Sequence, residues 1–345
     1  MPTELERTLA SLGLDQTPIT RNLLTMFNGL SRFESRCFVA AFNRLSSVRQ
    51  QALLDAMEAY ATQSFEADLV AIYRELLNHP DPAVRGRAVV GLWEDDNVRV
   101  LDALMRMLTH DPDVAVRAKV ATALGSFVFQ AECEELDESR ATALRRGLET
   151  TVANENEDLE VRRHAVEALG FINDDEVRRI IADAYAHDDE RMRVSALFAM
   201  GRSADECWTE TVLTELGSMS PAVLWEAVRA SGEIQIEQAV PPLAELLAES
   251  NVEMQKEIAW ALGKIGTRAA VRVIETLLES DNEGRRKVAE DALEEAAFGG
   301  LPDGEGYEPD DDEFDDDDLD DDDDEEEDED DSDDDEWADE HLELR

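Results

Sequence analysis

A glycine recurs every 31 residues through the middle of the chain, and each one closes a similar ten-residue segment. The four are Gly170, Gly201, Gly232 and Gly263, which end VRRHAVEALG, MRVSALFAMG, VLWEAVRASG and MQKEIAWALG. Related segments end at Trp93, Gly125 and Glu294. A fixed period of this length is typical of repeat architectures, in which each unit packs mainly against its neighbours. The period therefore predicts one long repeat array in this chain of 345 residues.

Each unit has the pattern of two packed helices. In the first helix an alanine recurs where close packing leaves no space for a larger side chain, at Ala88, Ala165, Ala196, Ala227 and Ala289. The glycine that follows suits the left-handed residue that ends many helices. Asp81-Pro82, Asp111-Pro112 and Ser220-Pro221 are expected to open first helices, with the side chain as a cap and proline in the first turn.

The second helix of each unit is predicted from apolar residues at helical spacing. The predicted buried positions are Val100, Leu104 and Leu108; Val177, Ile181 and Tyr185; Trp208, Val212 and Leu216; and Ala270, Ile274 and Leu278.

The pattern D-P-x-V-R-x-x-A-x-x-A-L-G, in units of about 31 residues, resembles the HEAT-like repeat that also occurs in phycobilin lyases. The resemblance implies an all-α fold, an α-α superhelix of the HEAT or armadillo type, which usually serves as a binding scaffold. It also implies that the repeat's arginine pairs with aspartates in neighbouring turns. The matching positions are Arg85, Arg117, Arg162 and Arg193, whereas Leu224 and Gln255 replace the arginine in later units.

Three regions are expected. Residues 1–77 are amphipathic and form an N-terminal helical cap with a degenerate repeat, and residues 78–298 form the solenoid. A 14-residue insertion near 130–138 predicts either a lengthened helix pair or a protruding acidic loop. Residues 299–345 are rich in Asp and Glu and are expected to be disordered, because such a block buries too little apolar surface to offset its ordering entropy.

Charge narrows the range of partners. The chain has 83 acidic and 32 basic residues, a net charge of -51. Residues 301–345 hold 30 of the acids and one Arg, which leaves 53 acids and 31 bases, net -22, in residues 1–300. Both parts repel phosphate backbones and anionic lipid, so neither nucleic acid nor a membrane is an expected partner. The start of the sequence lacks a signal-peptide pattern, and three separated cysteines suit reduced thiols, which predicts a cytoplasmic protein.

Motifs for catalysis are missing from the sequence. It contains no phosphate-binding loop, no dinucleotide fingerprint and no nucleophile elbow. The deoxyhypusine hydroxylases, which share this type of repeat, bind iron through His-Glu pairs, but no histidine here precedes a glutamate. His79, His110 and His187 occupy equivalent turns and are interpreted as caps. We therefore expect no catalytic residue, no cofactor and no metal site.

The leading hypothesis is a non-enzymatic scaffold for a protein partner, with the acidic tail steering or shielding basic partners. The predicted partner-binding ridge lies on the second helices and comprises Asp102, Arg106, Arg179, Asp183, Glu210, Glu245 and Arg272. The candidate tail anchors are Phe314, Trp337 and Leu342. Two alternatives stay open: an acidic chaperone or nucleic-acid mimic that acts through the tail, and a bilin-lyase-like enzyme or enzyme subunit. In a further hypothesis, Arg145-Arg146 and Arg178-Arg179 receive the tail.

Overall fold

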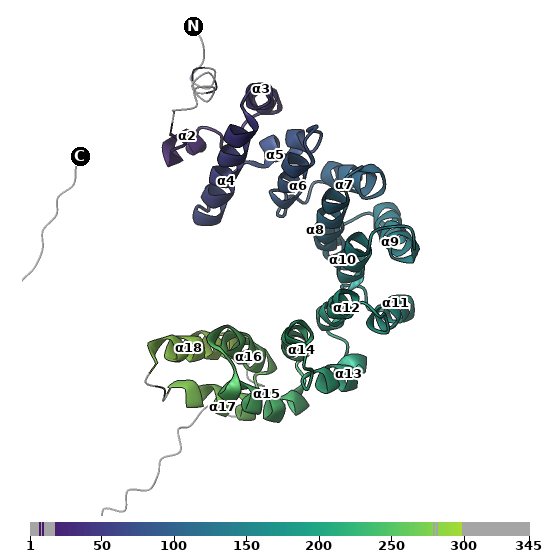
Figure 1. Cartoon of the computed structure of the whole chain (residues 1–345), viewed down its shortest axis with the longest axis vertical. Helices are drawn as coiled ribbons and strands as arrows, with labels where there is room; N and C mark the ends of the chain where they lie inside the picture. The colour runs from purple at the N-terminus through teal and green to yellow at the C-terminus, as the bar shows by residue number, and fades with distance from the viewer. Residues whose placement is uncertain (1–6, 8, 10–17, 279, 281, 299–345) are drawn as a thin grey trace, which may run out of the picture. The chain divides into compact units, whose positions relative to one another are not determined.

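A computed structural model of the chain describes residues 7, 9, 18–278, 280 and 282–298, and all regular elements within these residues are helical (Figure 1). The candidate tail anchors Phe314, Trp337 and Leu342 lie outside the described residues. In the described part of the chain, no helix combines the length and the apolar character that a membrane span requires.

The N-terminal part is helical, as the sequence predicts. It contains α2 (Arg21–Thr25), α3 (Arg32–Phe42), α4 (Ser47–Gln63) and α5 (Val70–Leu76). Its centre is a cluster of aromatic rings, because Phe27, Phe38 and Phe42 are completely buried and the rings of Phe27 and Phe38 meet edge to face at 4.9 Å. The proposed boundary at residue 77 stays a prediction.

Helix pairs follow one another along the rest of the described chain. The first helices are α6 (Pro82–Val90), α8 (Val114–Glu132), α10 (Leu159–Leu169), α12 (Glu190–Ser203), α14 (Pro221–Glu233), α16 (Val252–Ile265) and α18 (Glu283–Phe298). The second helices are α7 (Val98–His110), α9 (Glu138–Ala153), α11 (Asp175–Tyr185), α13 (Thr209–Glu215), α15 (Val240–Glu249) and α17 (Arg268–Leu278). Short 3-10 turns at Glu206–Trp208 and Glu237–Ala239 lead into α13 and α15.

Each first helix packs against the first helix of the next unit, while the second helices form the other layer (Figure 1). This two-layered ladder confirms the predicted α-solenoid. The insertion takes the form of a lengthened helix pair, since α8 runs on to Glu132 before the turn into α9.

The repeat alanines are buried as predicted: Ala88, Ala165, Ala196, Ala227 and Ala289 are all inaccessible to solvent. The predicted stripe of the second helices is also confirmed, with Val100, Leu104, Val177, Val212 and Ile274 among its buried members. Two positions differ from this prediction, because Tyr185 is only half-buried and Leu278 is wrong. Leu278 is exposed because the preceding residue, Leu277, faces the core instead.

The repeat glycines have a different role from the one expected. Gly201 and Gly232 lie inside α12 and α14 and do not end them in a left-handed conformation. A Cβ on Gly201 would lie 2.9 Å from Cα of Ala230, and one on Gly232 would lie 2.7 Å from Cα of Ala261. The glycine is therefore needed where two first helices cross.

The left-handed residues lie three positions beyond the glycines. Ala204, Gln235 and Gly266 have φ angles of 48°, 59° and 63° and are 31 residues apart. Ala204 and Gly266 are the C-terminal caps of α12 and α16. The period is thus correct and the position is shifted, because the helices run one turn further than expected.

Arginines and aspartates connect neighbouring units at the helix ends. Arg85 donates to both carboxylate oxygens of Asp111, at 2.7 and 2.8 Å, and both side chains are buried. Asp111 therefore binds Arg85 and does not cap α8, whose N-terminal cap is Asp113. Arg117 forms the same kind of pair with Glu157, at 2.7 and 3.2 Å.

The contact made at the repeat's arginine position changes along the chain. The Nε of Arg162 donates to the carbonyl of Val152 at 3.0 Å, and the Nε2 of Gln255 donates to the carbonyl of Leu247 at 3.1 Å. The implied pairing with acids thus holds in the first two units, with an aspartate in one and a glutamate in the other. Farther along, Arg162 and Gln255 bond the carbonyl end of the preceding helix, whereas Arg193 contacts Glu190 of its own helix at 3.9 Å.

Candidate functional site

Three positions of the first helices form a grid of polar and aromatic side chains across four successive units, which we call the first-helix face. It comprises His164, Glu167 and Phe171; Ser195, Phe198 and Arg202; Glu226, Arg229 and Glu233; and Glu257, Trp260 and Lys264. Each residue stands 31 positions from its equivalent in the next unit. All of them except the buried Ser195 are half-buried, although most of them are ionisable.

Cations are stacked on aromatic rings at the centre of this face. The guanidinium of Arg202 lies between two rings, 4.4 Å from the centroid of Phe171 and 4.5 Å from that of Phe198. Arg229, on α14, lies 5.0 Å from the centroid of the Phe198 ring, and its Nε donates to Glu233 at 3.3 Å. Burial lowers the pKa of Arg202, so this cation is held away from water by the rings that attract it.

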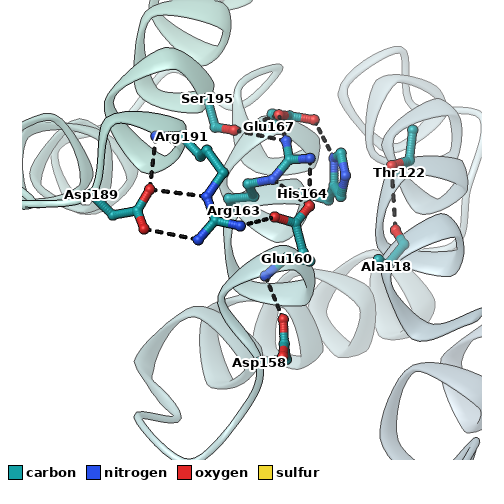
Figure 2. Close-up of polar contacts among 10 residues, drawn as sticks. All are labelled: Ala118, Thr122, Asp158, Glu160, Arg163, His164, Glu167, Asp189, Arg191 and Ser195. Carbon is teal, nitrogen blue, oxygen red and sulfur yellow. Dashed lines mark hydrogen bonds and ion pairs between the residues drawn. The ribbon is translucent and has the colours of Figure 1, made fainter. Parts of the chain in front are cut away.

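A polar network occupies the α10–α12 end of the face (Figure 2). Glu167 is its hub, because it accepts a hydrogen bond of 2.5 Å from the hydroxyl of Ser195 and contacts His164 at 2.6 Å. Arg163 joins Glu167 to Glu160, at 3.2 and 2.6 Å. The acceptor oxygens of Glu167 are therefore occupied by groups from both helices.

Glu226 lies farther along the same face and has no such partner. Its Oε2 atom is buried and receives no hydrogen bond from any described residue. Burial raises the pKa of this carboxyl to about 7, Arg229 opposes the rise, and Glu167, Glu233 and Glu257 add to it. Burial also raises the pKa of Glu233 and of Glu257.

A buried acceptor without a donor is costly, typically about 1–3 kcal/mol and more when it is charged. The negative field of three other carboxylates acts on Glu226, whereas the cations Arg202 and Arg229 are already engaged with rings and with Glu233. A donor that is also a cation would satisfy both the missing hydrogen bond and this field.

The ridge predicted on the second helices is on the surface. Asp102 is half-buried and contacts Arg140 at 3.5 Å, and Arg179 contacts Glu176 at 2.7 Å. The remaining ridge residues are exposed: Arg106, Asp183, Glu210, Glu245 and Arg272. They lie on successive second helices, and their role in binding stays a prediction.

Three of the four arginines considered as sites for the tail, Arg145, Arg178 and Arg179, have acidic partners already. Arg145 forms ion pairs with Asp174 and Glu149, and Arg178 bonds Asp205 at 2.5 Å. These contacts hold α9 to the start of α11 and α11 to the turn before α13.

Two of the three turn histidines cap as predicted. The Nδ1 of His79 accepts the backbone N–H of Asp81 at 3.1 Å, and that of His187 accepts the N–H of Asp189 at 3.0 Å. His110 instead contacts the carbonyl of Arg106 within its own helix. Over the residues for which coordinates are described, no three His, Cys, Asp or Glu side chains gather as a metal ion would require.

The sequence interpretation missed the first-helix face although the signal was present. Glu167, Phe198, Arg229 and Trp260 occupy one repeat position. Lining up the units at the glycine would have shown aromatic and charged residues alternating on a single side of the first helices.

Comparison with protein families identifies the repeat. A family model described as HEAT repeats matches residues 70–155 and 209–294. The search of curated proteins returned no match.

Three solved structures illustrate the similarity. The YibA protein of Escherichia coli is 14% identical, with 82% of this chain and 98% of that chain covered and a TM-score of 0.46. The CpcE–CpcF phycocyanin lyase complex of Nostoc is 19% identical, with 65% and 86% covered and a TM-score of 0.47. Human deoxyhypusine hydroxylase is 16% identical, with 86% and 96% covered and a TM-score of 0.33. At these values the similarities carry no argument about function.

The first matched segment contains α6 and α7 with α8 and α9, and the second contains α14 to α17 with most of α18. This chain therefore contains HEAT repeats, over residues 70–155 and 209–294.

Proposed function

We propose that this chain is a non-enzymatic scaffold that binds a basic segment of a protein partner on the first-helix face. The observation that carries the proposal is the buried Oε2 of Glu226, which lacks a hydrogen-bond donor among the described residues. A Lys or Arg side chain of the partner would supply that donor and meet the field of the neighbouring carboxylates.

The composition of the face supports binding to a protein. Trp and Arg contribute strongly to interface energies, and aromatic residues in general are enriched in interface cores; Trp260, Arg202 and Phe198 provide these types in one grid. The net charge of -22 in residues 1–300 attracts basic partners over long range. The acidic block of residues 310–335 would add to this steering.

The side chains that could act as a nucleophile or an acid support binding more than catalysis. Burial, and then the hydrogen bond with Asp205, raises the pKa of the Cys207 thiol to about 11, so the reactive thiolate is scarce at neutral pH. Glu167 and Ser195 are bonded to each other. The bilin-lyase alternative stays a prediction that a chromophore-transfer assay would test.

Proton release is a test specific to Glu226. When a cation binds, this carboxyl must become fully ionised, and a pKa of about 7 means that roughly half a proton leaves per ligand at neutral pH. We would titrate a short Lys/Arg peptide into the full-length chain by calorimetry, in two buffers of different ionisation enthalpy. Moderate salt would screen attraction to the aspartates of residues 310–335, and an ordinary aspartate is already ionised at neutral pH and releases no proton.

Variants locate the binding. Glu226→Gln should abolish the proton release and weaken binding about tenfold, since a charged hydrogen bond is worth about 1.5–3 kcal/mol. Glu245→Gln on the predicted ridge is the matched control and should leave both unchanged. Equal weakening by the two variants would move the binding to the ridge or to the general field. Binding without proton release in the unmodified chain would assign it to the tail.

A further inference from the structure

A cavity of about 460 Å³ lies near the N-terminal end of the solenoid, between α3, α5 and the start of α7. Its lining includes Arg32, Arg36, Arg74 and Arg99, with Glu75 as the single carboxylate. Four arginines around one cavity are unexpected in a chain that has 83 acidic and 32 basic residues.

One of the four arginines is neutralised. Arg74 donates to both oxygens of Asp95, each at 2.6 Å, and the Asp95 side chain is only 2% exposed. This pair fixes the wall of the cavity and contributes little net charge to it.

The other three arginines leave an excess of positive charge. Arg32 and Arg36 share one carboxylate, that of Glu75, at 3.6 and 3.3 Å, and both are well exposed. Exposed pairs of this kind are weak, about 0–1 kcal/mol, so an incoming anion can replace Glu75. Arg99 is exposed and its side chain has no ion pair with any described residue. Three guanidinium groups therefore face one carboxylate, an excess of two positive charges.

This excess matches a compact dianion. Guanidinium groups bind phosphate oxygens through paired N–H donors, and small-molecule sites typically have volumes of about 300–1,000 Å³. We propose that the cavity formed by Arg32, Arg36 and Arg99 binds the phosphate dianion of a small phosphate monoester. A long polyanion would extend over the negatively charged rest of the chain and be repelled. A single dianion between three guanidinium groups would interact mainly with the positive charges next to it.

The site is independent of the first-helix face. It lies on other helices, takes a ligand of opposite charge and does not depend on the proposed function. Either can fail without affecting the other.

Calorimetric titration of the full-length chain in low salt tests the proposal. The probes are phenyl phosphate, inorganic phosphate and phenol. We expect saturable binding of phenyl phosphate, weaker binding of inorganic phosphate, and none of phenol. No saturable binding of phenyl phosphate would overturn the proposal. Tighter binding of a phosphoserine peptide than of phenyl phosphate would also overturn it and assign the cavity to a protein partner.

Three substitutions in the cavity should change the affinity for phenyl phosphate, two by lowering it and one by raising it. Arg36→Ala and Arg99→Ala should each weaken phenyl phosphate binding about tenfold, because each removes a charged hydrogen bond. Glu75→Gln should strengthen it several-fold, because the competing carboxylate is gone. A purely structural role for Glu75 would not produce a gain. Arg272→Ala, at an exposed arginine on α17, is the matched control, and an equal loss in this variant would show that only general charge is involved.

Discussion

Gly232 and Ala261 meet where α14 crosses α16, and a Cβ on Gly232 would stand 2.7 Å from the Cα of Ala261. The two helix backbones are in direct contact at this crossing. Gly201 has the same relationship with Ala230, at 2.9 Å. The repeat glycine is thus a packing residue, and it sets how closely successive units approach.

Gly232→Ala should therefore lower the free energy of unfolding by about 1–3 kcal/mol, the usual cost of overpacking a tight core. Gly125→Ala is the matched control, since the same repeat position there leaves 3.5 Å to Ala168 and lies within α8. It should be neutral or stabilising by up to about 1 kcal/mol, because alanine favours helix over glycine. Urea unfolding of both variants measures the difference, and equal effects would contradict the packing role.

Ala204 occupies a left-handed conformation, with φ 48°, at the C-terminal cap of α12. A Cβ in this region costs about 1–2 kcal/mol, and glycine avoids that cost. Ala204→Gly should raise the free energy of unfolding by about 0.5–1 kcal/mol, reduced by the greater entropy of glycine in the unfolded chain. Gly266→Ala, at the equivalent position, should lower it. Thermal melts that showed the same sign for both changes would exclude this account.

Arg85 and Asp111 form the buried pair that joins α6 to the start of the next unit, and their side chains are 10% and 4% exposed. Asp111→Ala should destabilise the chain by about 3–5 kcal/mol, because it leaves a buried guanidinium without its acid. A double-mutant cycle with Arg85→Met measures the coupling, which should exceed that of the exposed pair Arg179–Glu176.

The same pair predicts the acid response. Burial opposes ionisation of Asp111, but hydrogen bonds from Arg85 and from the backbone of Asp113 outweigh it, so the pKa of Asp111 is lowered. A lowered folded-state pKa gives stability that is present above the unfolded value, about 3.9, and is lost as the pH falls. Asp111→Asn should therefore lose less stability than the unmodified chain between neutral pH and pH about 3. An identical acid profile would show that Asp111 does not contribute.

The sequence predicts the succession of helix pairs well because each pair is determined by residues within one unit and its neighbours. The 31-residue period, the buried alanines and the apolar stripes depend only on neighbouring units, so Ala165 and Val177 fall in the core as expected. The arginine of the motif is predictable for the same reason at Arg85. The period alone does not give the exact end of each helix. Gly201 lies inside α12, and the left-handed residue that ends this helix is Ala204.

The candidate sites depend on contacts between units and were harder to predict. Arg202 is stacked by Phe171 from the end of α10 and by Phe198 from α12, and this sandwich appears only when the two helices are packed. The carboxylates that raise the pKa of Glu226 come from α10, α14 and α16, so their effect appears only when these helices are packed. The arginine cavity joins α3 to α7 across more than 60 residues of chain, where no repeat aligns them.

Glu226 should make stability fall as the pH rises. Burial raises its folded-state pKa to about 7, whereas an unfolded glutamate titrates near 4.3. Between these values the folded chain binds more protons than the unfolded chain, so the free energy of unfolding decreases as the pH increases. Glu226→Gln keeps the shape of the side chain without the charge. It should match the unmodified chain near pH 4 and exceed its stability at pH 8 by on the order of 2 kcal/mol. Glu245→Gln, on the exposed side of α15, serves as the control and should follow the unmodified chain at every pH. Parallel curves for the unmodified chain and Glu226→Gln would mean that this carboxyl ionises freely, and the proton release on which the proposed binding test depends would then be absent as well.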